Sequence, residues 1–148
     1  MIEIIKDYAA CRDFAASFAA GPERLLRAIG EPERHCVLGV RRGGEMNGLF
    51  VFLVLPDERY LEMLTGLSRE RDAYMEAFDY LAQRYPGFGA DFVFSPDDAL
   101  LMAELAGRGA EFDPEQQLMT ADTPPAGVDT TGVEPLSARY AAQYCALH

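Results

Sequence analysis

Residues 46–85 read MNGLFVFLVLPDERYLEMLTGLSRERDAYMEAFDYLAQRY, and this stretch decides the fold. The segments 46–55 and 60–67 are mainly apolar and are separated by Pro56-Asp57-Glu58, so they are predicted to form two strands joined by a turn. The next segment, 69–85, repeats apolar residues at the spacing of a buried helix face: Ala73, Tyr74, Ala77, Phe78, Leu81 and Tyr85. A hairpin therefore leads directly into a long amphipathic helix, and Ser68 is its expected N-cap.

The segments before this stretch extend the predicted sheet. Residues 1–5 and 36–41 are predicted to be strands, and Arg42-Gly43-Gly44-Glu45 joins the second of them to the hairpin, since glycine readily adopts the positive φ of tight turns. Residues 8–20 and 22–30 lie between these strands and show helical spacing. Three successive strands on tight turns predict an antiparallel meander.

Further elements follow the long helix. Residues 91–95 are predicted to be a short buried strand, and Pro96-Asp97-Asp98 opens another helix. Residues 110–112 and 116–121 are predicted to form one broken strand. Because the long helix crosses over between the hairpin and the strand 91–95, these strands are expected to be parallel. The predicted fold class is α/β (α+β), with a mixed, mostly antiparallel sheet and helices on both faces.

The composition narrows the classes of partner. The chain of 148 residues carries 24 acidic and 13 basic side chains, a net charge of −11. This charge repels nucleic acids and anionic membranes, so neither is an expected partner. It either attracts a cationic or amine-bearing partner or serves only to maintain solubility. The three cysteines lack metal-ligand spacing, so no metal site is expected. The chain shows no signal peptide or membrane-spanning segment, which makes the cytoplasm the expected location.

The end of the chain is predicted to lie outside the main domain. Residues 123–132 contain two prolines and two glycines, a composition typical of a linker after a domain of residues 1–122. Residues 133–148 resume a strand-then-helix pattern similar to that of residues 4–10. Two interpretations stay open for them: a C-terminal helix that closes the domain or docks on a neighbouring chain, or the start of a second domain.

The order of elements resembles that of the GNAT N-acetyltransferases over roughly residues 1–121. Three local patterns carry the resemblance, the weakest being Gly109-Ala110-Glu111-Phe112, which resembles the glycine-led strand after the family's last helix. The other two are longer. One is the hairpin of residues 48–67 that leads into a helix. The other is the spacing of Asp98, Leu101, Leu105 and Gly109, where family members often have Asn, Ala, Tyr and Gly. The resemblance implies the acyl-CoA N-acyltransferase fold. It also implies acetyl transfer from acetyl-CoA to the amine of a small molecule or peptide, and either a homodimer or a covalently linked second GNAT domain as partner.

The resemblance further assigns a site for acetyl-CoA. In the family, the strand corresponding to 60–67 carries a bulge whose free backbone groups hold the pantetheine arm. The start of the next helix holds the pyrophosphate through backbone N–H groups. The residues thereby implied as cofactor-binding are Leu64, Gly66, Leu67, Ser68, Arg69 and Arg71.

Glu62 is the candidate catalytic residue. It alternates with Leu61 and Met63 and therefore shares a strand face with Tyr60 and Leu64. If that face opens on a cleft, Glu62 can accept a proton from an acceptor amine, directly or through water. The alternative is a solvated glutamate that pairs with a neighbouring strand.

Two departures from the family pattern leave the function open. Glu70 and Asp72 would place negative charge where the family has a glycine-rich phosphate loop, and Arg69 and Arg71 are expected to point in different directions. Leu105 takes the position of a tyrosine that, in many family members, protonates the leaving thiolate. Tyr60 or Tyr74 could take over that role, and the alternative is that both are aromatic residues of the core or its rim. The hypotheses are an acetyltransferase, a non-catalytic GNAT-like module that supplies an interface or completes the substrate cleft of a catalytic partner domain, and an unrelated α/β binding domain.

Overall fold

Five strands form one sheet in the spatial order β1-β2-β3-β4-β5. The computed structural model describes residues 1–114 and 131. The strands are β1 (Ile2–Ile4), β2 (His35–Arg42), β3 (Glu45–Leu55), β4 (Tyr60–Ser68) and β5 (Gly89–Phe92). Neighbours are antiparallel from β1 to β4, whereas β4 and β5 are parallel. The predicted meander and the predicted parallel crossover are both confirmed.

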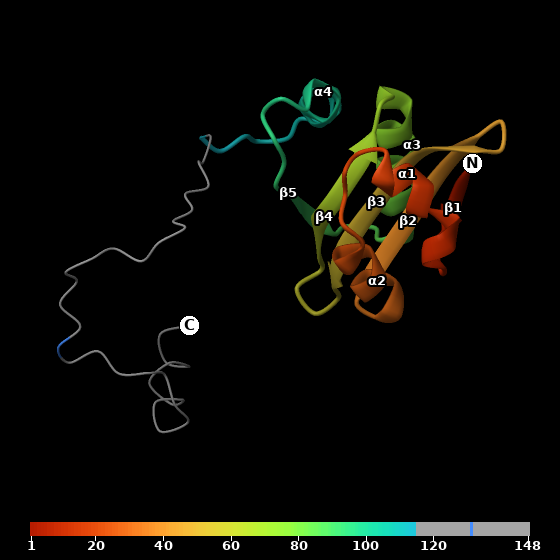
Figure 1. Cartoon of the computed structure of the whole chain (residues 1–148). Helices are drawn as coiled ribbons and strands as arrows, with labels where there is room; N and C mark the ends of the chain where they lie inside the picture. The colour runs from red at the N-terminus through yellow and green to blue at the C-terminus, as the bar shows by residue number, and fades with distance from the viewer. Residues whose placement is uncertain (115–130, 132–148) are drawn as a thin grey trace. The chain divides into compact units, whose positions relative to one another are not determined.

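Helices cover both faces of the sheet, as predicted (Figure 1). The short 3-10 helix η1 (Tyr8–Ala10), α1 (Arg12–Ala16) and α2 (Pro22–Gly30) pack on one face, and α3 (Arg71–Arg84) and α4 (Ala99–Gly107) pack on the other. Among the described residues, no helix is both long enough and apolar enough to cross a membrane.

Alternation along β3 divides the core into two layers. Phe50 and Phe52 pack against α3, where the ring centroids of Phe50 and Tyr74 lie 5.2 Å apart. Leu49 and Val51 point to the opposite face, into the cluster beneath η1, α1 and α2. Because both faces of β3 are buried, its sequence is a nearly continuous apolar run.

The predicted single helix over residues 8–20 is wrong, because η1 and α1 occupy this segment as two short helices. The Asp7 carboxylate accepts a hydrogen bond from the Ala9 N–H at 3.0 Å and caps a 3-10 turn. Cys11 then leaves helical geometry with a φ of −126°, and Ala19 adopts a positive φ of 54°. Local side-chain bonding therefore breaks a segment whose apolar spacing is helical throughout.

β5 begins two residues earlier than the predicted strand 91–95, and it ends at Phe92. Its ladder with β4 starts where Gly89 faces Tyr60. A β-carbon at position 89 would lie only 2.7 Å from Tyr60 Cε2, so the absence of a side chain lets the two strands approach there.

The predicted strand over residues 110–112 is also wrong. The Ala110 N–H donates to the Leu105 carbonyl at 3.0 Å, and Gly109 has a φ of +77°, so these residues close α4. The remainder of that predicted strand, 116–121, lies outside the described residues. The same holds for the predicted linker 123–132, apart from residue 131, and for the segment 133–148.

The start of α3 rests on β3 at Gly48, which pairs with Ser68 of β4. A β-carbon at position 48 would lie 2.9 Å from the Ala73 β-carbon and 2.7 Å from Phe50 Cε2. Ala73 is itself fully buried in the first turns of α3. Glycine on the strand and alanine on the helix therefore let the two backbones approach closely, and this contact positions the N-terminus of α3.

Replacing Gly48 with alanine is expected to lower the free energy of unfolding by about 1–3 kcal/mol, because Ala73 lies on a packed helix and cannot yield. Gly30→Ala is the matched control: it ends α2, and a β-carbon there meets nothing within 4 Å. Urea unfolding followed by circular dichroism measures both variants. Equal effects at the two positions would contradict the close approach of α3 to β3.

Candidate functional site

β4 contains a β-bulge at Leu64. Adjacent residues of β3 pair with Thr65 and Met63, so Leu64 between them has no partner in the ladder. Its carbonyl oxygen accepts a hydrogen bond from Arg24 Nη1 of α2 at 2.5 Å. The strand therefore has the bulge that the family resemblance implies, and one of the free backbone groups of the bulge is already bonded to α2.

β4 continues beyond the end of β5. The parallel ladder ends where Met63 faces Phe92, while β4 runs on to Ser68. Within residues 1–114, no strand pairs with this edge of residues 64–68. The sheet is thus open on one side of the bulge, and backbone groups there are available to a ligand.

Glu62 lines a hollow of about 1060 Å³ that is bordered by α2, β4 and Val93 just after β5. Its neighbours Leu61 and Met63 belong to the core layer under α3, so Glu62 faces the α2 side of the sheet. In the described part of the chain, the Glu62 carboxylate makes no hydrogen bond or ion pair. Glu62 and Leu64 share this hollow, which is large enough for a small molecule or the end of a peptide.

Ser68 is not the N-cap of α3, contrary to the prediction. β4 extends through Ser68, so the helix begins only at Arg71 and Glu70 is the N-cap. The Ser68 hydroxyl accepts a hydrogen bond from the Glu70 N–H at 3.0 Å and donates one to the Asn47 carbonyl at 2.8 Å. One N–H group of the predicted phosphate site is therefore bonded within the protein.

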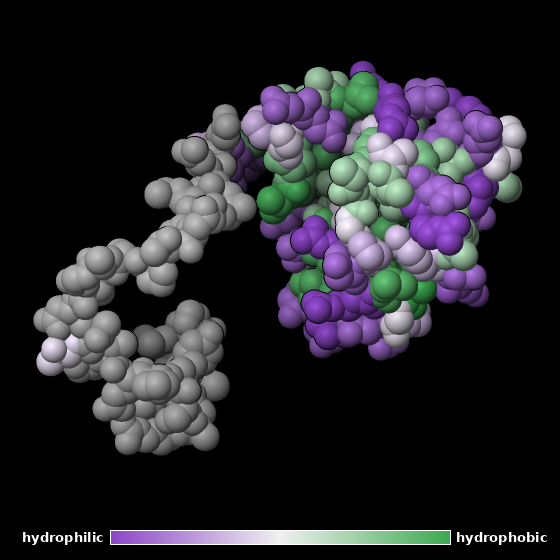
Figure 2. Space-filling model, in the orientation of Figure 1, coloured by the Kyte–Doolittle hydropathy of each residue, from purple (hydrophilic) through white to green (hydrophobic). Residues whose placement is uncertain are grey.

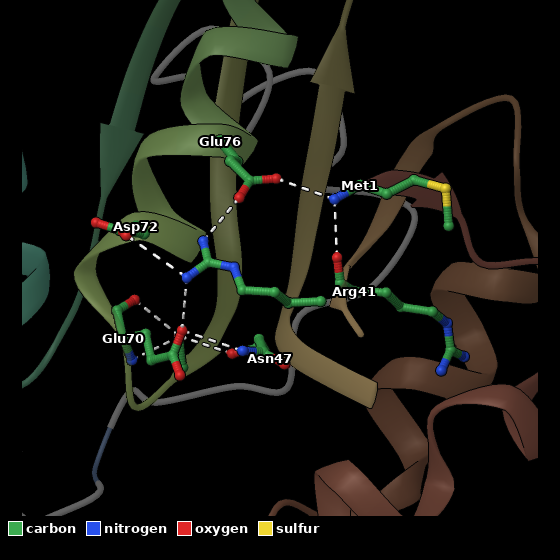
Figure 3. A network of polar contacts seen from close by, with 8 residues as sticks. Met1, Arg41, Asn47, Glu70, Asp72 and Glu76 are labelled. Atoms are coloured by element: carbon green, nitrogen blue, oxygen red, sulfur yellow. Dashed lines mark hydrogen bonds and ion pairs between the residues drawn. The ribbon is translucent and has the colours of Figure 1, made fainter. Parts of the chain in front are cut away.

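Three carboxylates surround Arg42 at the start of α3, and together these four residues form the Arg42 cluster (Figure 3). The guanidinium lies 3.3 Å from Glu70, 3.5 Å from Asp72 and 3.0 Å from Glu76. The α-ammonium group of Met1 lies 3.2 Å from Glu76. Hydrogen bonding from Arg42 lowers the pKa of Glu76 against the opposing effect of burial, and the ammonium group of Met1 acts in the same direction.

The two arginines of the predicted phosphate site do not come together. Arg69 donates to the Ser17 carbonyl at 3.0 Å, and its guanidinium carbon lies 4.2 Å from the centroid of the Phe18 ring. Arg71 donates through Nε to Glu104 of α4 at 3.0 Å. The first arginine therefore holds the segment after α1 on one face of the sheet, and the second ties α3 to α4 on the other.

Glu104 is the buried acid that receives Arg71. Its side chain is only 5 % exposed, and Arg108 donates to it at 2.7 Å. Burial alone would favour the neutral form, but the hydrogen bonds from Arg108 and Arg71 lower the pKa of Glu104, so it stays ionised. Arg71 is thus committed to a buried ion pair.

Gly66 and Leu67 have packing roles. A β-carbon at Gly66 would lie 2.9 Å from Met63 Sδ, and Leu67 packs against the core cluster beneath η1, α1 and α2. Both residues lie on the segment of β4 that extends past β5. Their role in holding a pantetheine arm stays a prediction.

Tyr60 and Tyr74, the two residues that could replace the family's tyrosine, both have hydroxyl groups that are hydrogen-bonded within the protein. Leu105 is buried in the core under α3. Tyr74 is fully buried; burial and its hydrogen bond to Asp98, at 2.8 Å, raise the pKa of its phenol. Hydrogen bonding to Asp91 raises the pKa of Tyr60 at the half-buried start of β4. The expectation of core and rim aromatics is confirmed.

Two arginines that face the hollow were missed by sequence reasoning. Arg24 and Arg27 line it from α2, while Leu25 and Ala28 of the same helix are buried. The sequence does contain a signal for them. Arg24 and Arg27 are three residues apart and each precedes a buried residue, Leu25 or Ala28, so both lie at the border of the apolar face of α2. Which strand they face depends on tertiary structure alone.

No protein-family model matches the chain, and no curated protein matches it. Solved structures do. The ribosomal-protein-alanine N-acetyltransferase of Brucella melitensis biovar Abortus 2308 is 14 % identical, with a TM-score of 0.55 over 82 % of this chain and 97 % of that one. An aminoglycoside N-acetyltransferase in complex with CoA is 10 % identical, with a TM-score of 0.53 over 84 % of this chain and 100 % of that one. An aminoglycoside acetyltransferase from an uncultured soil metagenomic sample, in complex with sisomicin, is 13 % identical, with a TM-score of 0.51 over 84 % and 95 %.

These likenesses show the fold. The mixed sheet with helices on both faces is the acyl-CoA N-acyltransferase fold of the GNAT acetyltransferases. At such low identities the likeness extends to the fold alone. Whether this chain suits coenzyme A therefore depends on its own residues.

The start of α3 does not fit the phosphates of coenzyme A. Phosphates need free N–H groups and positive charge at a helix N-terminus. Here the N–H of Glu70 is bonded to Ser68, and the carboxylates of Glu70 and Asp72 project at this end of the helix. Arg69 and Arg71 are engaged elsewhere.

Arg42→Gln is expected to lower the free energy of unfolding at neutral pH and low salt, because it leaves three carboxylates close together. Arg42 lowers the pKa of Glu76 in the folded chain. The stabilisation is therefore complete at pH values above the unfolded pKa of a glutamate, about 4.3, and it disappears as the pH falls through the lower pKa of the folded state. The difference from the unmodified chain should therefore vanish in acid.

Urea unfolding at several pH values measures this effect. Arg12→Gln is the control, because Arg12 pairs only with its exposed neighbour Asp13. A destabilisation by Arg42→Gln that is independent of pH would show that packing rather than charge is responsible.

Proposed function

We propose that this chain is a non-catalytic module with the acetyltransferase fold, which keeps a cleft for an amine-bearing ligand and works beside a separate catalytic domain. The observation that carries the proposal is the Arg42 cluster. In this fold the start of α3 would receive the phosphates of coenzyme A, and here it presents the carboxylates of Glu70 and Asp72.

Electrostatics supports this proposal. A pyrophosphate would bring further negative charge to the place where the cluster already holds three carboxylates. Repulsion between charges a few ångströms apart is strong in a partly desolvated site. Arg42, the cation at hand, is shared among all three carboxylates. The carboxylates of Glu70 and Asp72 thus lie at the N-terminus of α3, where an anionic ligand would otherwise bind.

The replacement of the family's tyrosine by Leu105 supports the proposal independently. Leu105 takes the position where many family members have a tyrosine. Tyr74, one of the two substitutes, is fully buried and its phenol is bonded to Asp98. General acid catalysis typically contributes two to four orders of magnitude in rate, about 10²–10⁴-fold. A chain without it would be a poor transferase.

A second candidate function is acetyl transfer by this chain itself, from acetyl-CoA to an amine. Two observations favour it: the bulge at Leu64 and the position of Glu62 in the hollow beside it. In this alternative, Glu62 is the base that accepts the proton of the amine, and Leu64, Gly66 and Leu67 hold the cofactor's arm. The two functions differ in whether the phosphates bind.

The unmodified chain is expected to show no thermal stabilisation by acetyl-CoA. For comparison, a ligand at about 1 mM with a dissociation constant of about 10 µM would add roughly 2.7 kcal/mol. Differential scanning fluorimetry with acetyl-CoA, and with pantetheine as a phosphate-free control, measures the shift. Stabilisation by acetyl-CoA that is lost in Arg69→Glu/Arg71→Glu would overturn the proposal in favour of the transferase.

A charge-neutral variant tests the physical cause. Glu70→Gln/Asp72→Asn frees Arg42 from two of its partners and removes two charges, so its affinity for inorganic pyrophosphate should rise by about tenfold or more. Asp57→Asn/Glu58→Gln is the matched control, since it removes the same charge from the exposed turn between β3 and β4. Isothermal titration calorimetry compares the two. An equal gain in both variants would show that only net charge matters.

A further inference from the structure

The hollow beside the bulge is lined by charged side chains of both signs. From α2 and the residues that follow it come Glu23, Arg24, Arg27, Glu31, Arg34 and His35, and from β4 comes Glu62. The wall between them is apolar and includes Leu53, Leu64 and the exposed Val93. The face is visibly hollowed between the α2 layer and the β5 end of the sheet (Figure 2).

Most of these charges already have partners. Arg24 donates to the Leu64 carbonyl at 2.5 Å. The Glu31 carboxylate lies 3.9 Å from Arg34 and 3.7 Å from His35. These groups stabilise the walls of the hollow.

Three charges that line the hollow make no hydrogen bond or ion pair among the described residues: Arg27 and Glu23 of α2, and Glu62 of β4. Arg27 follows Arg24 by one turn of α2 and therefore lies on the same side of the helix. Glu62 faces the α2 side because Leu61 and Met63 face the other. One unpaired cation on α2 thus faces the unpaired carboxylate of Glu62 on β4 across a single hollow, and Glu23 adds a second unpaired carboxylate on the α2 side.

We propose that this hollow binds a ligand that carries both an ammonium group and a carboxylate, such as an amino acid or the short end of a peptide. Glu62 accepts hydrogen bonds from the ammonium group, and Arg27 binds the carboxylate through its planar guanidinium fork. The apolar wall contacts a small aliphatic body between the two ends. This inference rests on the amine cleft of the proposed function and adds the second, acidic end of the ligand.

Physical chemistry favours a zwitterion over a simple amine. An amine alone would satisfy Glu62 but leave the Arg27 guanidinium without an anionic partner in the hollow, and an anion alone would do the reverse. Arginine–carboxylate pairs are directional and frequently bidentate, so the arginine adds specificity as well as affinity. A zwitterionic ligand also adds no net charge to a chain whose charge is already −11.

The test uses the full chain and alanine, dialanine and trialanine as probes, so that the separation of the two charges varies. Each peptide is compared with its N-acetylated and its C-amidated form. Titration followed by ¹H–¹⁵N correlation spectra gives the dissociation constants and locates the contacts. At least one free peptide should bind and shift the amide signals of residues 24–27 and 62–65, and each blocked form should bind about tenfold more weakly.

Two variants assign the ends of the ligand. Arg27→Gln should weaken binding of the free peptide about tenfold but leave binding of the C-amidated form unchanged. Glu62→Gln should weaken binding of the free peptide about tenfold but leave binding of the N-acetylated form unchanged. Arg27→Lys should recover part of the affinity. Arg12→Gln, an exposed residue of α1 outside the hollow, is the matched control for charge.

The possible outcomes separate this inference from the proposed function. If no member of the series binds the unmodified chain, or if blocking either end leaves the affinity unchanged, the inference is overturned. Binding that shifts amides elsewhere overturns it as well. The proposed function is decided separately by acetyl-CoA, whose phosphates would bind at α3 and not in this hollow.

Discussion

The arrangement around the start of α3 depends on the ion pairs that Arg42 makes with three carboxylates. Arg42 stands at the end of β2 and holds carboxylates from the start of α3 to its second turn, while Glu76 of the same set also receives the amino terminus of the chain. Without this guanidinium, the acids at Glu70, Asp72 and Glu76 would repel one another beneath the helix that covers the sheet. The bulk of the core packs beneath that helix, so its position matters to the whole domain.

The same interaction affects what the start of α3 can bind. The N-terminus of a helix attracts anions, whether they come from a ligand or from the protein. Here Glu70 and Asp72 supply the negative charge from within the chain, with Arg42 as their counter-ion. The N-terminus of α3 can be stabilised by side-chain carboxylates of the chain or can bind the phosphates of a ligand, but the same backbone N–H groups do not serve both. Under the proposed function, the fold persists while the start of α3 no longer binds phosphates.

The predictions that succeeded were those fixed by hydrophobic periodicity. The nearly continuous apolar run over residues 46–55 and the helical spacing over 69–85 require burial, so the order and direction of β2, β3, β4 and β5 follow. The predictions that failed depend on single contacts. The Asp7–Ala9 hydrogen bond interrupts a helical pattern, and the approach of Tyr60 to Gly89 shifts the start of β5. Neither contact leaves a periodic signal in the sequence.

The site was predictable to the same degree. The face of Glu62 follows from its apolar neighbours. Arg69 and Arg71 do diverge as predicted, although Arg69 precedes α3 and helical geometry is therefore not the reason. By contrast, Arg42 reaches α3 and Arg24 reaches Leu64 across long stretches of chain. Such pairs are set by how the elements pack, so a single sequence does not reveal them. This is why Ser68 was assigned as a cap although β4 runs through it.

The short parallel ladder has a consequence for how the hollow opens. β5 is only four residues long, and within the described residues it has a strand neighbour on one side alone, β4. α4 is attached to α3 instead, through Glu104 between Arg71 and Arg108. Local opening follows the elements with the fewest buried contacts. β5 can therefore detach from β4 while α4 keeps its place on α3, and its amide hydrogens should exchange with solvent well before those of β2 and β3. Since Val93 follows β5 directly, access to the hollow is coupled to the opening of this short edge strand.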